Sequence, residues 1–467
     1  MWRFIKKGEA HYKILPELTA NKEVEVFGTE QILKEFSDKT IKQASNTANT
    51  AGVHKINLNA DAHEGYGCPI GSVVATADTV MLGPIGYDIS CSMSYIQTDI
   101  PIAEIESKKV RRSIIDNLCK YVPQGTGKAR APNQIKISKQ LYKQILAEGA
   151  SSKEVLQQLG IDNTWLESLE RTHLEADPDL LSSKVIDRGE GQLGSLGSGN
   201  HFLEGQKVKI IDKKIANVFG ISENLGLLTH CGSRGLGHQI ATEYFEKLWK
   251  YSNEKGIIVA DKELVYADID SALGKKYLLS MGCAANFAII NHLVINNAIY
   301  SALMDLYPSV KCNFVYHISH NLVQKELIGQ KEYYIHRKGA TRAFPEGHPY
   351  LENTKFIETG HPVIIPGSSI SGSSIMVGLP GNEKNFHSTP HGCGRSMGRR
   401  EAKRRLDQKF VNEKMDEADV LSNRRNYPID EFSDAYKDYN EVIKSVEIAG
   451  LAKEVVKLSP LFVIKGN

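Results

Sequence analysis

The chain has 467 residues, 41% hydrophobic and 24% charged, so it can bury one large hydrophobic core or two ordinary ones. Its net charge of +2 neither demands nor excludes a nucleic-acid partner, because binding needs only a local basic surface. The seven cysteines are scattered and contain no Cys-x-x-Cys pair, which argues against a disulfide framework or a zinc ribbon.

Neither an export signal nor a membrane span is expected. The opening residues, MWRFIKK, are too short and too charged for a signal peptide. No apolar run approaches the roughly 18 residues that a membrane span needs. We therefore expect a globular protein in a reducing, cytoplasmic compartment, with no membrane among its partners.

In chain order, the sequence predicts an α+β fold with a mixed β core. Residues 53–100 alternate short apolar runs with glycines, which is typical of buried strands joined by tight turns. Residues 101–185 predict a helical insertion, with helices over 108–122, 135–146 and 153–159. The later elements are expected to be helices over 238–255 and 275–307, strands over 312–320 and 361–379, a basic helix over 395–421 and a closing strand from 461. Since no repeat or flexible linker divides residues 1–467, we expect one domain with surrounding helices.

Two stretches are rich in basic residues. Residues 127–144 have no acid, and residues 395–405 have one. For the first stretch, a solvated helix face and an RNA contact are equally open interpretations. Its basic residues are Lys128, Arg130, Lys136, Lys139 and Lys143.

Four strand or loop ends carry metal-binding residue types beside glycine. Asp88-Ile-Ser-Cys91 follows a glycine-containing turn and sets a carboxylate three residues from a thiol. A glycine-rich loop runs into His201, one strand ends at His230, and another ends at His320. Thiol, imidazole and carboxylate together suit a divalent ion such as manganese, zinc or iron. A structural role is open for each motif alone, but the four together favour a shared metal site.

Three further segments have the character of a phosphate or nucleotide site. The loop from Gly194 to Glu204 offers exposed backbone N–H groups beside Asn200, and residues 366–374 are rich in serine. His391-Gly-Cys-Gly-Arg395 sets an imidazole four residues before an arginine that can neutralise a phosphate. An imidazole can act as a covalent nucleophile when a metal assists the electrophile. No Gly-x4-Gly-Lys-Ser/Thr loop and no Lys-x-Asp-Gly motif is present, so a nucleotide site must be of a different design.

Several longer motifs follow one another in a recognisable order. They include Asp61-Ala-His-Glu-Gly-Tyr-Gly-Cys-Pro-Ile-Gly71, Tyr87-Asp-Ile-Ser-Cys91, Gly197-Ser-Gly-Asn-His-Phe-Leu-Glu204, Gly232-Ser-Arg-Gly-Leu-Gly-His-Gln239, His336-Arg-Lys-Gly-Ala-Thr-Arg342, Pro362-Val-Ile-Ile-Pro-Gly-Ser368, His391-Gly-Cys-Gly-Arg395 and Lys465-Gly466. From about residue 50 to the C-terminus, the chain resembles the RtcB family of RNA-splicing ligases. The resemblance implies one RtcB-like domain.

The resemblance also implies a chemistry. Two manganese ions would be bridged by Cys91, one completed by Asp88 and His201 and the other by His230 and His320. His391 would attack the α-phosphate of GTP and carry GMP. The residues implied around the nucleotide are Asn200, His201, Phe202, Leu203, Glu204, His320, Asn321, Pro366, Gly367, Ser368, Ser369, Ser373, His391, Gly392, Cys393 and Gly394, with Tyr436 and Lys465 at the guanine.

The implied reaction joins RNA ends in tRNA splicing or RNA repair. A 2′,3′-cyclic phosphate or 3′-phosphate end would be joined to a 5′-hydroxyl end. A metal-dependent phosphoesterase acting on RNA ends is the alternative, since similar ligands can activate water. A silent RNA-binding protein that keeps the scaffold is the second alternative. The RNA substrate and the need for an activating protein partner stay open.

The chain departs from the pattern of the family near the nucleotide site. Ser319 stands where alanine is usual, His361 where glutamine is usual, and Cys393 where alanine is usual. The serine loop over residues 369–374 is also altered. The five implied ligands and His391 are unchanged, so the departures favour a divergent paralogue with its own RNA substrate.

Overall fold

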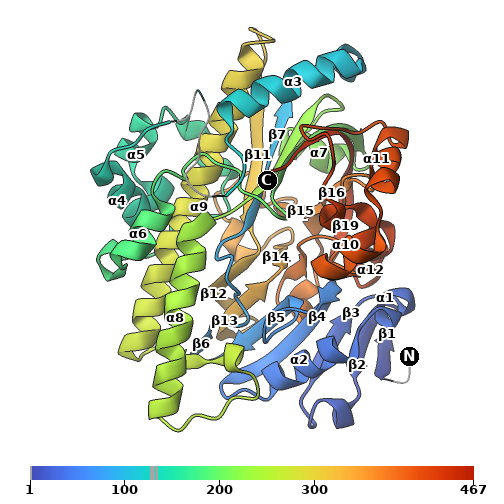
Figure 1. Cartoon of the computed structure of the whole chain (residues 1–467). Helices are drawn as coiled ribbons and strands as arrows, with labels where there is room; N and C mark the ends of the chain where they lie inside the picture. The colour runs from blue at the N-terminus through green and yellow to red at the C-terminus, as the bar shows by residue number, and fades with distance from the viewer. Residues whose placement is uncertain (1–2, 127–131, 133–134, 467) are drawn as a thin grey trace.

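The strands form two large mixed sheets, shown in the computed structural model, which describes residues 3–126, 132 and 135–466 (Figure 1). The first sheet has the order β1 (Phe4–Gly8), β2 (His11–Ile14), β3 (Val24–Phe27), β4 (Val53–His63), β5 (Ile70–Thr76), β13 (Lys331–Lys338) and β12 (Asn321–Ile328). Most neighbours are antiparallel, whereas β3 and β4 are parallel. The predicted α+β class with a mixed β core is confirmed.

The second sheet carries most of the candidate site. Its order is β11 (Cys312–Ser319), β7 (Ser92–Thr98), β9 (Gly226–Cys231), β8 (Phe202–Ile210), β19 (Ala452–Ile464), β16 (Ser373–Gly378) and β15 (Pro362–Pro366), with β18 (Leu421–Ser422) parallel to β19. Two short pairs complete the strands, β6 (Thr79–Met81) with β10 (Tyr266–Asp268) and β14 (Ala340–Arg342) with β17 (Ser388–Pro390).

Helices cover the second sheet along the left and across the top of Figure 1, where α3 lies. They are α3 (Lys108–Tyr121), α4 (Lys139–Glu148), α5 (Lys153–Gln158), α6 (Ser183–Gly189), α8 (Arg234–Glu254) and α9 (Ala272–Met304). The described part of residues 101–185 holds α3, α4, α5 and several 3-10 turns joined by irregular segments. α4 begins at Lys139 rather than 135, because the Ser138 hydroxyl accepts from Leu141 N at 3.1 Å and caps the helix there. Lys128 and Arg130 of the basic stretch lie outside the described residues.

The remaining helices lie in the N-terminal region and around β19. They are α1 (Glu30–Lys34), α2 (Asp38–Ala48), α7 (Lys213–Phe219), α10 (Arg399–Arg405), α11 (Gln408–Glu417) and α12 (Tyr439–Ile448). The single basic helix expected over 395–421 is wrong. α10 ends before Asp407, whose carboxylate accepts from Lys409 N and Phe410 N and starts α11 as a separate helix.

Helix α9 corrects the expectation that no apolar run is long enough to cross a membrane. By length and composition it passes that test, but 89% of its most apolar window is buried inside the protein. Burial of each large apolar side chain stabilises the fold by about 1.5–3 kcal/mol. Its polar residues hold neighbouring segments. Asn286 donates to the carbonyls of Leu146 and Leu174, both at 3.0 Å, which ties the insertion to the core.

Candidate functional site

Four strand ends of the second sheet meet at one edge. The neighbours β11, β7, β9 and β8 are antiparallel, so the start of one lies beside the end of the next. Ser92 pairs with Ser319 on one side and with Cys231 on the other, and Phe202 pairs with His230. The side chains next to these positions therefore share one edge.

The five side chains singled out by the sequence are in contact there, in a continuous order. Asp88 Oδ2 lies 3.2 Å from His201 Nε2, which lies 3.4 Å from Cys91 Sγ. Cys91 Sγ lies 3.1 Å from His230 Nε2, which lies 3.4 Å from His320 Nε2. The ligand atoms of Cys91, His201 and His230 all fall within 4.8 Å of one another. Cys91 is thus the central member of the row, with two donors on each side.

The electrostatics of this donor cluster suit a metal ion. Burial lowers the pKa of His230 and of His320 well below the ordinary value, so both imidazoles are neutral and offer a lone pair. Burial also raises the pKa of the Cys91 thiol, so the proton must leave when a metal binds. One thiolate, three imidazoles and one carboxylate fit a divalent transition metal better than calcium or magnesium.

Backbone hydrogen bonds fix the positions of these donors. His320 N donates to the Cys91 carbonyl at 2.9 Å, where β11 leaves the second sheet for β12 in the first. The Asn321 side chain donates to the Asp88 carbonyl at 3.1 Å and accepts from Gly339 N at 2.7 Å. The donors are therefore held between the two sheets before any ligand binds.

The glycine-rich loop before β8 positions His201. Asn291 of α9 accepts from Gly194 N at 2.7 Å, and the Leu196 carbonyl lies 3.1 Å from His201 Nδ1. Gly197 has φ +98°, and a Cβ there would overlap Nη1 of Arg234. Only glycine fits at this position, so its place in the motif follows from close packing as well as from backbone conformation.

His391 stands beside the donor cluster. It follows β17, its ring centroid lies 4.9 Å from that of His320, and its Nδ1 lies 2.7 Å from Oδ2 of fully buried Asp61. If Nδ1 carries the proton shared with Asp61, the Nε2 lone pair is free to attack an electrophile. The contact between Asp61 and His391 could not be predicted from sequence patterns, because the two residues are 330 positions apart in the chain.

A second cluster surrounds Glu431, a residue that the sequence patterns did not single out. Lys465 Nζ lies 3.3 Å from Glu431 Oε2 and donates to the Gly199 carbonyl at 2.9 Å. The Tyr436 hydroxyl donates to Glu431 at 2.7 Å and accepts from Arg395 at 3.2 Å. The two residues implied at the guanine, Lys465 and Tyr436, are thus joined through one buried carboxylate.

Phe202 links the two clusters. Its ring centroid lies 5.5 Å from that of His230 and 6.0 Å from Lys465 Nζ. On the same strand, Glu204 accepts from Gln206, whose amide also donates to Ser373 at 3.4 Å. The strand end from 202 to 206 therefore connects the donor cluster, the C-terminal lysine and the serine loop.

The other implied nucleotide residues differ in accessibility. Asn200 is half-buried and Pro366 is the last residue of β15. The Ser368 hydroxyl donates a hydrogen bond to the Ser433 hydroxyl at 2.7 Å. Gly367 N donates to the Gly372 carbonyl at 2.8 Å and closes the serine loop. Most of the implied side chains are buried, among them those of Leu203, Ser369 and Cys393. Leu203 and Cys393 belong to hydrophobic cores, so they support the site through packing.

Two departures from the family pattern have structural explanations. The Ser319 hydroxyl donates to Glu170 at 2.7 Å, and Glu170 also pairs with Arg342 at 2.8 Å. Serine at this position therefore adds a contact to Glu170 of the helical insertion. His361 Nε2 accepts from Phe344 N at 3.0 Å, and burial lowers its pKa to about 4, so this neutral ring supports the backbone. Nothing in the structure explains the cysteine at 393.

Glu204 predicts a pH dependence of stability. Burial raises its pKa from 4.5 to about 7. Between these values the folded protein holds a proton that the unfolded chain has lost, so the free energy of unfolding falls as pH rises, by about 3 kcal/mol in all. Glu204→Gln should remove this loss and be more stable than wild type at pH 8. Melting temperatures from pH 5 to 8 test this in protein without nucleotide, with exposed Glu246→Gln as the control. Parallel curves for Glu204→Gln and wild type would contradict it.

Comparison with known proteins identifies the family. A family model described as tRNA-splicing ligase RtcB matches residues 43–466. The tRNA-splicing ligase RtcB of Thermococcus kodakarensis is 33% identical and covers 94% of each chain. That of Nanoarchaeum equitans is 35% identical over 97% of this chain and 98% of its own. RNA-splicing ligase RtcB homolog 1 of Entamoeba dispar is 36% identical over 94% of this chain and 84% of its own. The chain belongs to the RtcB family of tRNA-splicing ligases.

Proposed function

We propose that this enzyme is a GTP- and manganese-dependent RNA ligase that works through a histidine–GMP intermediate. It would join a 2′,3′-cyclic phosphate or 3′-phosphate end to a 5′-hydroxyl end, in tRNA splicing or RNA repair. The observation that carries the proposal is His391, an imidazole oriented by Asp61 at 2.7 Å and set against the donor cluster. Hydrolysis of an RNA end would need no such oriented nucleophile.

The donor cluster supports a two-metal site. The contact order, Asp88 and His201 on one side of Cys91 and His230 and His320 on the other, matches two ions that share the thiolate. Such ions would neutralise phosphate charge and polarise the phosphorus–oxygen bonds. Manganese is our assignment for both.

The residues of this chain would act in three steps. His391 Nε2 forms a bond to the α-phosphorus of GTP, and pyrophosphate leaves. Where the RNA ends in a cyclic phosphate, water first opens it to a 3′-phosphate. An oxygen of this 3′-phosphate then attacks the phosphorus of the histidine-bound GMP, which transfers GMP to the RNA and frees the imidazole. The 5′-hydroxyl oxygen then attacks the phosphorus of that 3′-phosphate, GMP leaves, and a phosphodiester remains.

The cluster around Glu431 supports the nucleotide assignment. Lys465 brings a cation to Phe202 and is joined through Glu431 to the Tyr436 hydroxyl, and the carboxyl group of Glu204 lies on the same strand as Phe202. These groups can donate to and accept from a guanine, and an aromatic ring gives it a face to contact. We also propose a cytoplasmic location, which the seven free cysteines support.

An RNA-joining assay tests the proposed function. Labelled RNA with a 2′,3′-cyclic phosphate and a 5′-hydroxyl is incubated with the enzyme and Mn²⁺, together with GTP, ATP or no nucleotide. We expect a joined product only with GTP. Opening of the cyclic phosphate without joining, to the same extent with and without GTP, would instead establish the phosphoesterase.

A further inference from the structure

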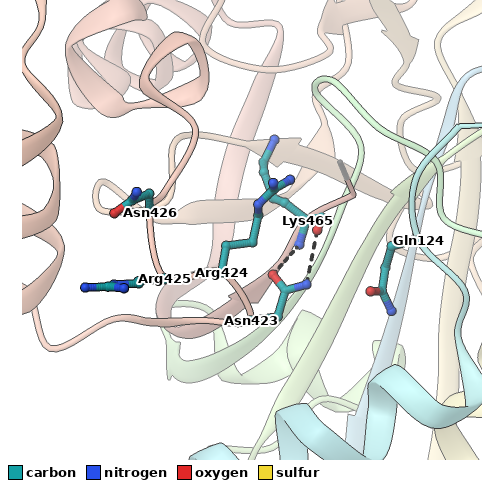
Figure 2. Close-up of a pocket in the computed structure, with 6 residues that line it drawn as sticks. All are labelled: Gln124, Asn423, Arg424, Arg425, Asn426 and Lys465. Carbon is teal, nitrogen blue, oxygen red and sulfur yellow. Dashed lines mark hydrogen bonds between the residues drawn. The ribbon is translucent and has the colours of Figure 1, made fainter.

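A polar pocket of about 490 Å³ is lined in part by Lys465, a residue that it shares with the cluster around Glu431. Figure 2 shows its six lining residues, with Gln124 on one side of Lys465 and the loop from Asn423 to Asn426 on the other. These six residues are two arginines, one lysine and three amides, with no carboxylate among them. A pocket of this size can hold one nucleotide unit of a chain.

The walls of the pocket are fixed by hydrogen bonds. The Asn423 amide donates to the Lys465 carbonyl at 3.1 Å and accepts from Lys465 N at 3.0 Å, as the dashed lines in Figure 2 show. Arg424 donates to the Gly466 carbonyl at 2.8 Å. Because these bonds are to backbone, they hold the loop without neutralising the guanidinium.

The pocket backs directly onto the loop that carries His201. Gly125, next to Gln124, donates to the Gly197 carbonyl at 2.8 Å. A Cβ on Gly466 would overlap that same carbonyl oxygen, so the C-terminal segment passes between these two loops in close contact. A ligand in the pocket would therefore lie beside Lys465 and next to the loop that carries His201.

The charges of this pocket distinguish it from the basic helix α10. Arg399 and Lys403 are paired with Asp430, and Arg405 is paired with Glu401. Among the described residues, neither Arg424 nor Arg425 has an ion-pair partner. Positive charge that has no counter-ion in the described part of the chain is available to an anion, and the planar guanidinium suits a phosphate.

We propose that this pocket binds a phosphate and its nucleotide from the RNA strand whose end is to be joined. Arg424 and Arg425 would contact the phosphate, and the amides of Gln124 and Asn426 would contact the ribose or base. The inference rests on the proposed function only in taking RNA as the substrate. It makes the pocket a binding site for RNA that adjoins the proposed GTP site and shares Lys465 with it.

Binding of RNA without GTP tests this assignment. A fluorescent single-stranded RNA with a 3′-hydroxyl, which the proposed reaction cannot join, is titrated by anisotropy at several salt concentrations. Arg424→Gln/Arg425→Gln should bind about tenfold more weakly near 0.1 M salt. The slope of log affinity against log salt should become shallower by about 0.7 for each phosphate that the variant no longer binds. Lys6→Gln/Lys7→Gln, at an exposed pair in β1, has the same charge change and should bind as wild type does.

Two results would overturn the assignment. One is wild-type affinity and salt slope in Arg424→Gln/Arg425→Gln. The other is that Arg400→Gln/Arg404→Gln, at two exposed positions of α10, weakens binding in its place. If the double variant has a lowered melting temperature, Arg425→Gln alone, at an exposed side chain, serves for the same comparison. A wild type that binds RNA but joins no ends would defeat the proposed ligase and leave this binding site standing.

Discussion

Replacing His391 by alanine is expected to abolish covalent attachment of GMP and to slow RNA joining by at least about a thousandfold. The substitution removes the imidazole that Asp61 orients at the edge of the donor cluster. His230 and His320 cannot take its place, because their Nε2 atoms face each other at 3.4 Å within the cluster. The measurement is incubation with Mn²⁺ and α-labelled GTP, scoring acid-labile, hydroxylamine-resistant label on the protein.

The control for this experiment is another histidine. His173 is exposed in the helical insertion, and His173→Ala should label as wild type does. Label from GTP on wild type and on His173→Ala, but not on His391→Ala, would establish the intermediate. Equal labelling of His391→Ala would assign the covalent step to a different residue, and no label on any of the proteins, with GTP or with ATP, would favour the phosphoesterase.

The donor cluster was predictable because each of its members lies at the end of a strand or in the loop beside one. Apolar runs that end beside glycine and then Asp, Cys or His mark the edge of a sheet, and antiparallel neighbours bring such ends together. The order of contacts was not predictable in this way. That order depends on the pairing of β11, β7, β9 and β8, which sets Ser92 beside Ser319 although the two lie far apart in the chain.

The second cluster was less predictable. Glu431 lies in a short irregular segment between α11 and α12, where no periodicity indicates which residues point inward. Its partners Lys465 and Arg395 come from other parts of the chain, and only the family resemblance draws attention to Lys465. Arg424 and Arg425 were missed for a related reason, since two adjacent arginines in a loop usually mean a solvated surface.

Helix boundaries show which local signals were sufficient. α9 was predicted within a few residues, because an apolar run of this length has few alternatives to a buried helix. The break between α10 and α11 was not predicted. The run of basic residues suggested one continuous helix, and the preference of Asp407 for a helix N-cap was not considered. The N-cap residue therefore divides a segment that composition alone predicted as one helix.

Replacing Cys91 by alanine is expected to lower bound manganese from two ions per chain to one or fewer, and to slow RNA joining by at least about a thousandfold. Cys91 is central in the contact order, so its removal takes a donor from both halves of the cluster. Equilibrium dialysis with Mn²⁺ gives the stoichiometry independently of activity. Cys68→Ala, at another buried cysteine, is the matched control and should keep both ions.

The same variant tests the protonation of the site. Burial raises the pKa of the Cys91 thiol, so at neutral pH the metal-free protein holds a proton that must leave on binding. Manganese affinity of the wild type should therefore rise with pH, and calorimetry in buffers of different ionisation enthalpy should show proton release. His230 and His320 contribute none, because their lowered pKa values keep them neutral already. Cys91 and Asp88 hold the pKa of His201 well above its ordinary value, so that ring also has a proton to release. Cys91→Ala should release fewer protons than wild type, and a variant that still binds two ions and releases as many protons as wild type would exclude Cys91 as the bridging ligand.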